Sequence, residues 1–389
     1  MKILVVLSRF PYPLEKGDKL RAYHQIKHLS LNHEVILCCV TDKLPSEAER
    51  AEIEKITSEI HVYKLNKLYQ LLRLGYSLFS SKPFQTHYFF QRKIAANIQA
   101  IIEKTKPSHI YCQLIRASEY VKNFHSVPKT IDYMDALNKN YSRRISEAKG
   151  IRKWFIKEEA KRLVRYENLV FDYFENHTII SEQDQQLIYH QKRENIEVIP
   201  NGVDFDYFSP NPNDTKTIDI LFTGNMGYLP NENAALYLIK EVMPVIWELN
   251  PEINVTIAGA NPSLELLKLK SSKVNITGWV NDIRDIFNDS KVFVACMRQG
   301  TGLQNKLLEA MSMKLPCITT KLANNALGAT PNEELYIYDN KEHLASLIIH
   351  LLNSESAQKE MAEKGNQFIH KNFSWQSANK KLEQLIINS

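Results

Sequence analysis

The sequence predicts an α/β protein of two domains, each built on a parallel sheet with helices on both faces. Its 389 residues exceed the roughly 250 to 300 at which a single hydrophobic core usually stops growing. With 44% hydrophobic and 24% charged residues, the chain has enough apolar material for two cores. Short apolar runs also alternate with segments of helical period along the whole chain, as expected of doubly wound sheets.

The first half of the chain contains five runs that are typical of buried strands. Each run is short and largely apolar, and a longer segment with helical period follows it. The runs cover residues 2–8, 34–41, 109–113, 129–133 and 177–181. Helices are expected to fill the gaps between these strands, so this half should form the first doubly wound unit.

The second half repeats the alternation with five further runs. They cover residues 219–223, 254–258, 273–277, 291–297 and 316–320. Proline, asparagine, glycine and aspartate gather at residues 199–214 and break both periodicities, which is typical of a linker. We therefore predict a first domain at residues 1–195, a second at 196–372, and a final helix at 373–389 that returns to the first domain.

The sequence predicts a cytoplasmic protein. It has no run of the ~18 uninterrupted apolar residues that a membrane-spanning helix needs, and the apolar run at residues 3–7 is too short for a secretory signal. Its five cysteines lie in apolar strand-like runs without CxxC spacing, so we expect reduced core residues. Histidine and carboxylate spacings typical of metal sites are absent as well, and we predict no bound metal.

Charge is divided unevenly along the chain. Residues 1–180 carry 30 Lys and Arg against 19 Asp and Glu, whereas residues 181–389 carry 19 against 25. The basic half is therefore expected to face an anionic partner, such as a phosphorylated acceptor or a membrane surface. The acidic second half and the lack of a recognition motif argue against nucleic acid.

Residues 61–102 lack acidic side chains but carry six Lys or Arg and eight aromatic residues. One interpretation is a surface for the acceptor or for peripheral contact with the inner face of the membrane. The alternative is a set of solvated basic helices whose aromatic side chains belong to the core. The sequence leaves both open. The aromatic residues include Tyr69, Tyr76, Phe79, Phe84, Phe89 and Phe90.

The most informative segment, residues 291–320, is typical of a strand, a glycine turn, a helix and a second strand. Apolar side chains at helical spacing predict a helix that begins just after Gly302 and buries one face on the sheet. These side chains are Leu303, Leu307, Leu308 and Met311. The front of such a helix, beyond a strand's carboxyl end, offers free amides and a positive dipole to an anion such as a diphosphate.

Side chains around this turn are suited to binding an anion. Gly300 and Gly302 let the backbone approach a ligand closely, and Arg298 and Lys306 carry positive charge. Glu309 follows Lys306 at helical spacing and is placed to reach ribose hydroxyls. An ordinary crossover with surface charges would contain a similar glycine turn, so these residues alone leave both interpretations open.

Several motifs, in this order along the chain, resemble those of family 4 retaining glycosyltransferases. The segment GTGLQNKLLEAMSMKLPCITT is similar to the donor-binding block of that family, in which a glutamate of an EAM-like stretch binds the nucleotide ribose. The resemblance extends to PNGVD, TGNMGYLPN, TGWVNDIRDIF and the N-terminal RFPYPLEKGDKLR. It therefore covers nearly the whole chain, and the combination is more specific than any single motif.

The resemblance implies the GT-B fold, in which two Rossmann-like domains face each other across a cleft and bind acceptor and nucleotide sugar respectively. It implies that backbone near Trp279 and Val280 contacts the base, that Glu309 binds the ribose and that the glycine turn cradles the diphosphate. A first-domain loop would cover the donor from the other side. The donor-binding residues so implied are Lys16, Gly17, Gly224, Asn225, Val280, Gly300, Thr301, Gly302, Leu303, Gln304, Asn305 and Glu309.

Two departures from the family pattern bear on the donor. Where the family commonly has a glutamate that touches the donor sugar, this chain has Thr301, so the identity of the sugar stays open. Many members also carry an Arg and a Lys just after the first strand of the second domain, whereas residues 225–231 contain no basic side chain. We therefore hypothesise that Arg298 and Lys306 meet the phosphate charge and assist catalysis.

Asp132 and Asp135 stand at the end of an apolar strand, where α/β enzymes place reactive groups. Asp135 is the stronger candidate for a catalytic group that orients or deprotonates the acceptor hydroxyl. A structural role as a helix cap or turn residue would explain the same aspartate equally simply.

The expected function is transfer of a hexose-type sugar from a nucleoside diphosphate sugar, with UDP as a first guess, to a hydroxyl of a glycan or lipid-linked acceptor in polysaccharide biosynthesis. The resemblance implies retention at the anomeric carbon, and no cofactor is expected. A nucleotide-sugar epimerase of the same fold and an inactive donor-binding scaffold subunit are the alternatives.

Overall fold

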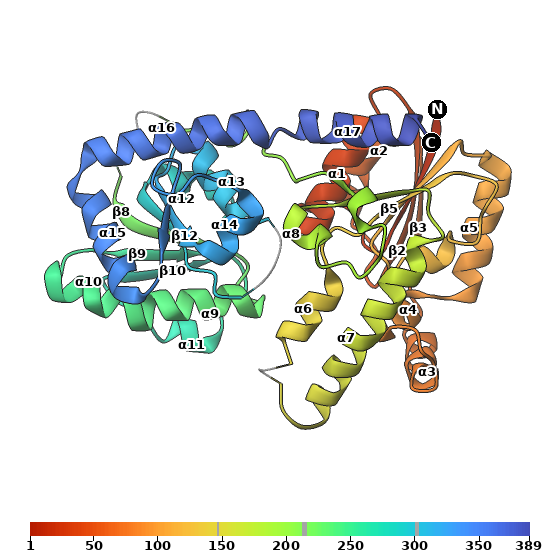
Figure 1. The fold of residues 1–389 in the computed structure, drawn as a ribbon, viewed down its shortest axis with the longest axis horizontal. Coiled ribbons are helices and arrows are strands. Elements are labelled where there is room, and N and C mark those ends of the chain that lie inside the picture. The colour runs from red at the N-terminus through yellow and green to blue at the C-terminus, as the bar shows by residue number, and fades with distance from the viewer. Residues whose placement is uncertain (146–147, 212–215, 300–302) are drawn as a thin grey trace. The chain divides into compact units, whose positions relative to one another are not determined.

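The chain forms two compact units, each with one sheet of parallel strands covered by helices (Figure 1). The computed structural model describes residues 1–145, 148–211, 216–299 and 303–389. Unit 1 consists of Met1–Pro200 and Gln376–Ser389, and unit 2 of Asn201–Trp375. The predicted α/β class with two doubly wound parallel sheets is confirmed.

The sheet of unit 1 has the strand order β3-β2-β1-β4-β5-β6-β7. The chain therefore builds outward from β1 in one direction and then returns to place β4 on its other side, with Ile3 opposite both Val35 and His109. The strands are β1 (Lys2–Leu7), β2 (Glu34–Thr41), β3 (Glu59–Lys64), β4 (His109–Gln113), β5 (Lys129–Asp132), β6 (Asn176–Ile179) and β7 (Glu197–Val198).

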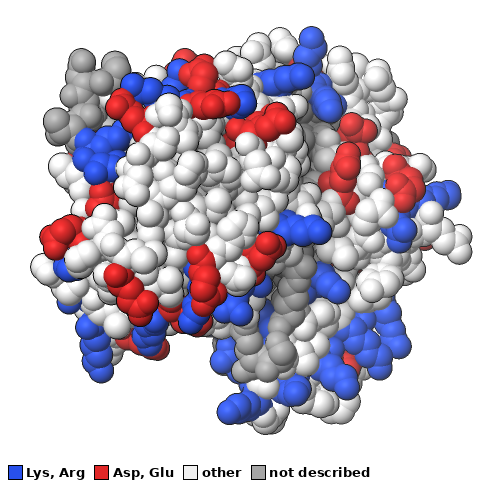
Figure 2. All heavy atoms as spheres, turned by 60° about the vertical axis from the view of Figure 1, so that its left-hand side comes forward, with Lys and Arg blue, Asp and Glu red and all other residues white. Residues whose placement is uncertain are grey.

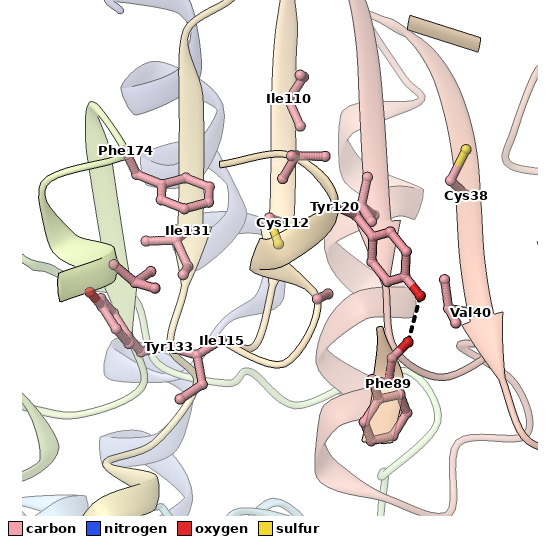
Figure 3. Close-up of a cluster of buried hydrophobic side chains, with 14 of the residues drawn as sticks. Cys38, Val40, Phe89, Ile110, Cys112, Ile115, Tyr120, Ile131, Tyr133 and Phe174 are labelled. Atoms are coloured by element: carbon pink, nitrogen blue, oxygen red, sulfur yellow. Dashed lines mark hydrogen bonds between the residues drawn. The ribbon is translucent and has the colours of Figure 1, made fainter. Parts of the chain in front are cut away.

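Helices cover both faces of this sheet and close an apolar core on each face. Figure 3 shows part of one core, in which the hydroxyl of Tyr120 donates to the carbonyl of Phe89. The helices are α1 (Gly17–Leu29), α2 (Glu47–Glu54), α3 (Lys67–Ser77), α4 (Phe84–Phe89), α5 (Arg92–Thr105), α6 (Leu137–Arg143), α7 (Gly150–Phe171), α8 (Glu182–Gln185) and α17 (Trp375–Ile387).

The sheet of unit 2 has the order β10-β9-β8-β11-β12-β13. Its strands are β8 (Ile218–Thr223), β9 (Val255–Ala258), β10 (Val274–Gly278), β11 (Ser290–Ala295), β12 (Cys317–Thr320) and β13 (Tyr336–Tyr338). Its helices are α9 (Leu229–Tyr237), which continues as a π-helical turn (Leu238–Val242) into α10 (Met243–Leu249), then α11 (Leu264–Leu267), α12 (Ile283–Asn288), α13 (Asn305–Ser312), α14 (Lys321–Leu327), α15 (Lys341–Asn353) and α16 (Glu355–Asn372).

Two expectations from the sequence were wrong in detail. The strands β3, β7 and β13 were not predicted, and all three lie at sheet edges, where partial exposure removes the continuous apolar run of a central strand. Helix α13 begins at Asn305 rather than just after Gly302, because the backbone at Gln304 is still extended, with φ −89° and ψ 96°.

A buried ion pair ties the centre of unit 1 together and gives Asp132 a structural role. The guanidinium of Arg21 donates from Nε and Nη2 to Asp132 at 2.7 and 3.1 Å, and both side chains are wholly buried. The same carboxylate accepts from Tyr111 and Thr178, while Nη1 of Arg21 donates to the carbonyl of Ile199. Its interpretation as a reactive group at the open edge of the sheet was therefore wrong.

Replacing Arg21 with Met should lower the free energy of unfolding of unit 1 by about 3 to 5 kcal/mol, because the Asp132 charge would stay buried without its cation. Urea unfolding followed by circular dichroism measures the change. Arg50→Met is the matched control, since Arg50 pairs with Glu54 on the surface and should cost below ~1 kcal/mol. Equal losses in the two variants would contradict the prediction.

Candidate functional site

The open edge of the unit 2 sheet has the geometry at which parallel α/β sheets bind ligands. Strand order reverses between β8 and β11, so the loops that follow these two strands diverge to opposite faces of the sheet. A crevice forms at such a switch point beyond the carboxyl ends of the strands. The predicted glycine turn and the front of α13 follow β11, which places both at this edge.

Two glycines let the loops after β8 and β9 pack without side chains between them. A Cβ atom added to Gly259 would lie 1.9 Å from the carbonyl oxygen of Gly224. A Cβ atom added to Gly224 would lie 2.8 Å from Nδ2 of Asn231 and 2.9 Å from Nζ of Lys306. Backbone and a cationic side chain therefore meet here at distances that only glycine permits.

Lys306, in the first turn of α13, is held at the switch point by neighbours from three other segments. Its Nζ donates to Oδ1 of Asn231 at 2.7 Å and lies 4.5 Å from the ring centre of Phe222 and 3.8 Å from Sδ of Met297. Loss of water around the ammonium lowers the pKa of Lys306 to about 8, although the charges of Cys296 and Glu309 act to raise it. The site thus contains a cation that is poorly compensated by protein groups.

Glu309 lies three residues beyond Lys306 on α13 and interacts with its charge. Burial raises the pKa of this carboxyl to about 7, and the Lys306 charge acts in the opposite direction. Within the described parts of the chain, the Glu309 carboxylate accepts no hydrogen bond. A carboxylate in this state is suited to accept hydrogen bonds from hydroxyl groups of a ligand.

Amide side chains order the loop that follows β8. Oδ1 of Asn225 accepts from the backbone N–H of Gly227 at 2.9 Å and from Nδ2 of Asn261 at 3.2 Å, while Nδ2 of Asn231 donates to the carbonyl of Asn225 at 2.9 Å. Asn231 therefore joins this loop to Lys306. Sequence reasoning did not single out Asn231, Gly259 or Asn261, although a glycine directly after a strand was a signal for the second of them.

A residue at the start of unit 2 holds the side chain of Asn305 in place. The side chain of Asn201 is wholly buried and donates from Nδ2 to Oδ1 of Asn305 at 3.1 Å. This contact joins the PNGVD stretch to the front of α13 and explains why the two motifs occur together. Asn201 was not predicted as a site residue.

The structure brings together some predicted donor residues and separates others. Gly224 and Lys306 meet directly, with Asn225 joined to them through Asn231. Arg298 is exposed, and its guanidinium lies 4.8 Å from the ring centre of Tyr237.

The remaining predicted residues are divided between the two units. In unit 2, Val280 follows the exposed Trp279 in the loop after β10, Leu303 is buried, and Gln304 precedes α13. Gly300, Thr301 and Gly302 lie outside the described residues. Lys16, Gly17 and Asp135 belong to unit 1.

The corresponding edge of unit 1, where β1 and β4 are neighbours, carries paired charges. Nη1 of Arg9 donates to the buried Asp18 at 2.6 Å, and Nη2 of Arg116 lies 3.9 Å from the same carboxylate. Burial lowers the pKa of Arg116, as does the charge of Arg9, while the charges of Asp18, Tyr141 and Asp135 raise it. Asp135 therefore stands near a guanidinium that sequence reasoning did not identify.

Two further searches of the described residues were negative. Among residues 1–145, 148–211, 216–299 and 303–389, no three His, Cys, Asp or Glu side chains are grouped so that they could hold a metal ion. In these same ranges, no helix has the length and apolar character needed to cross a bilayer.

A family model described as "Glycosyl transferases group 1" matches residues 217–354, the greater part of unit 2. An uncharacterized 44.6 kDa protein in the cps region of Klebsiella pneumoniae is 26% identical over 392 residues, which cover 96% of each chain. The Escherichia coli UDP-Gal:alpha-D-GlcNAc-diphosphoundecaprenol alpha-1,3-galactosyltransferase is 31% identical over 146 residues, which cover 33% of this chain and 38% of that enzyme.

Solved structures share the architecture of the whole chain. The crystal structure of Anabaena Alr3699/HepE in complex with UDP covers 100% of both chains with a TM-score of 0.73 at 12% identity. TarM covers 99% of this chain and 98% of its own, with a TM-score of 0.69 at 14% identity. Unit 2 thus contains a group 1 glycosyl transferase domain, and the chain as a whole has the GT-B fold of these solved structures, as expected of a glycosyltransferase.

Proposed function

We propose that this enzyme moves a hexose-type sugar from UDP to a hydroxyl of a glycan or lipid-linked acceptor, with retention at the anomeric carbon and without a metal or other cofactor. The observation that carries the proposal is the poorly compensated cation of Lys306 beside two glycine loops and the Glu309 carboxyl. A pyrophosphate needs such a cation, and ribose hydroxyls need such an acceptor. UDP is favoured because Anabaena Alr3699/HepE was crystallised with UDP and with UDP-glucose.

The proposed chemistry depends on charge that develops on the leaving group. As the bond from the anomeric carbon to the phosphate oxygen breaks, negative charge accumulates on the nucleoside diphosphate. The Lys306 ammonium and the positive end of the α13 dipole are fixed before the reaction, so they stabilise this charge more in the transition state than in the ground state. Arg298 contributes a weaker attraction from its exposed position on Tyr237.

Asp135 is proposed to orient or deprotonate the acceptor hydroxyl. It follows β5 at the open edge of the unit 1 sheet, and its charge acts on the guanidinium of Arg116. A carboxylate in such a position is available as a general base. Lys16 and Gly17 are proposed to contact the donor, as the family resemblance implies.

The relatives and the charge of the chain support a proposal for the acceptor and the location of the enzyme. The E. coli relative acts on a sugar linked to diphosphoundecaprenol, and the first half of this chain carries the excess of positive charge. We propose a cytoplasmic enzyme of polysaccharide biosynthesis that contacts the inner face of the membrane through residues 61–102. Nucleic acid is not expected as a partner.

A nucleotide panel followed by a donor screen tests the proposed reaction. UDP, GDP, dTDP and CDP are compared by thermal shift, where a ligand at 100 times its Kd adds ~2.7 kcal/mol. The UDP sugars are then supplied with and without acceptor. Interconversion of donors without acceptor would identify an epimerase, and nucleotide binding with neither transfer nor hydrolysis would identify a scaffold subunit; either result would overturn the proposal.

Replacing Lys306 with Ala should weaken UDP binding by more than about tenfold, ~1.4 kcal/mol, because the pyrophosphate loses its enclosed cation. Isothermal titration calorimetry measures the change. Arg298→Ala should weaken binding less, since water screens an exposed guanidinium. Lys314→Ala is the control, because Lys314 pairs with Glu363 on the surface. Unchanged affinity in Lys306→Ala would remove this residue from the site.

UDP affinity should fall about tenfold between pH 7 and pH 9. The pKa of Lys306 is lowered by burial to about 8, so the ammonium is charged below that pH and about nine tenths neutral at pH 9. In Lys306→Arg the cation stays charged over this range, and the fall should disappear. Calorimetry at the two pH values checks both proteins, and an equal fall in both would contradict the assignment.

Asp135→Asn should reduce kcat by about a hundredfold or more, in the range that general base catalysis contributes. UDP affinity should stay unchanged, because the substitution leaves unit 2 untouched. Steady-state transfer rates measure the loss of kcat, and calorimetry measures whether UDP affinity is unchanged. Asp172→Asn, at an exposed position of unit 1, is the control. Full turnover in Asp135→Asn would show that the aspartate is a structural turn residue.

A further inference from the structure

Helix α3 has the opposite orientation to that of an ordinary amphipathic helix. Its leucines Leu68, Leu71 and Leu72 are 66 to 69% exposed, and Phe79, just after the helix, is 90% exposed. By contrast, the polar side chains of Gln70 and Ser77 are buried. Surface helices of globular proteins turn their apolar stripe toward the core, so the outer face of α3 is suited to contact with another apolar phase.

Polar contacts with the rest of unit 1 fix this orientation. Nε2 of Gln70 donates to Oδ1 of Asp42 at 2.9 Å, and Nη1 of Arg162 on α7 donates to the carbonyl of Ser77 at 2.7 Å. The side chain of Asn66 also caps the front of the helix by accepting from the N–H of Tyr69 at 3.1 Å. Rotation of the leucines toward the core would break the hydrogen bond between Gln70 and Asp42 and expose the buried Gln70 side chain.

The first turns of α7 extend the exposed apolar surface. Ile151 and Trp154 are 77% and 52% exposed. Phe155 packs its ring 5.5 Å from that of Phe84 and, with Leu74 of α3, lines a cavity of about 290 Å³ with mainly apolar walls. Because side chains of both helices line this cavity, α3 and the start of α7 lie next to each other and form one surface. We call this surface the α3–α7 face, and its outermost side chains are Leu68, Leu71, Leu72, Phe79, Ile151 and Trp154.

Most exposed charges around the α3–α7 face are positive, although the exposed Asp42 accepts hydrogen bonds beside α3 from Gln70 and Tyr88. Arg152, Lys153 and Lys157 are exposed on α7, Lys67 is the exposed first residue of α3, and Lys64 ends β3 three residues before it. The acidic residues of this part of α7 are occupied within the protein. Glu158 pairs with Arg162, and the buried Glu159 accepts from the backbone N–H groups of α4. Figure 2 shows Lys and Arg gathered at the lower end of the view, the level at which Figure 1 draws α3 and the start of α7.

The exposed apolar side chains and the surrounding positive charge together indicate which kind of partner could cover the α3–α7 face. A second copy of the chain, related by a two-fold axis, would place the same cations opposite one another. An anionic bilayer instead complements both features, because its headgroups attract Lys and Arg and its acyl boundary accepts leucine, phenylalanine and tryptophan.

We propose that the α3–α7 face docks on the surface of an anionic lipid bilayer, with Phe79 and Trp154 entering the acyl boundary. The proposal deepens the membrane contact of the proposed function but corrects its location. Within residues 61–102, Phe89 is buried in the core of Figure 3 and Phe84 packs on Phe155, so the docking residues there are those of α3 and Phe79 just after it. The start of α7 lies outside that range.

Co-sedimentation with phosphatidylcholine vesicles, with or without phosphatidylglycerol, tests the proposal on the full chain. The wild type should sediment with the anionic vesicles, and added salt should weaken binding. The double variant Leu71→Ser/Phe79→Ser should bind at least about tenfold more weakly. The matched control is Leu249→Ser/Leu264→Ser, which changes two leucines that are 71% and 78% exposed on unit 2 and should bind as the wild type does.

Tryptophan fluorescence and oligomeric state provide the second readout. Insertion of Trp154 should shift the emission to the blue on anionic vesicles, and Trp154→Phe should abolish that shift. No vesicle binding by the wild type, equal loss in the control, or a dimer that Leu71→Ser/Phe79→Ser converts to a monomer would each overturn the proposal. Transfer to a water-soluble acceptor is measured in the same variants. Substitutions of docking residues should leave this transfer rate unchanged. The assay therefore distinguishes failure of the docking proposal from failure of the proposed function.

Discussion

The proposed donor site depends on a lysine ammonium that is kept at the edge of a parallel sheet with little water around it. Oδ1 of Asn231 accepts a hydrogen bond from the Lys306 Nζ and the ring of Phe222 lies beside it, but neither neutralises its charge. Attraction to a polyanion is stronger where water is excluded, so this desolvation prepares the site for a pyrophosphate. Gly224 and Gly259 preserve the arrangement, since a side chain at either position would displace the loops that enclose the lysine.

The two sheets share an architecture, but the charged side chains at their open edges are paired to different extents. In unit 1 the cations at the β1 and β4 boundary already have carboxylate neighbours, as Arg9 has in Asp18, and the central Arg21 is matched by Asp132. The excess positive charge of the first half is therefore not concentrated at that edge. Much of it surrounds the α3–α7 face. Unit 2, although acidic overall, keeps an isolated cation where the donor phosphate is proposed to bind.

The sequence identified central strands well because burial on both faces leaves continuous apolar runs. It missed β3, β7 and β13 because edge strands carry a weaker signal. In the site, the resemblance pointed to Lys306 and Glu309, whereas Asn231 acts through contacts 75 residues away that no local pattern contains. The orientation of α3 is likewise decided by tertiary contacts, namely those of the Gln70 side chain and the Ser77 carbonyl, and composition alone left it open.

Unit 1 consists of two segments that are far apart in the sequence, so it can be completed only after the second segment has been synthesised. Leu382 and Ile386 of α17 are wholly buried against β-strand side chains such as Val5 and Leu37, and Glu383 pairs with His28 near the end of α1. These partners are translated more than 300 residues before α17. A nascent chain therefore carries an incompletely covered apolar sheet face until α17 emerges from the ribosome, and this interval is when chaperone binding would protect it from aggregation.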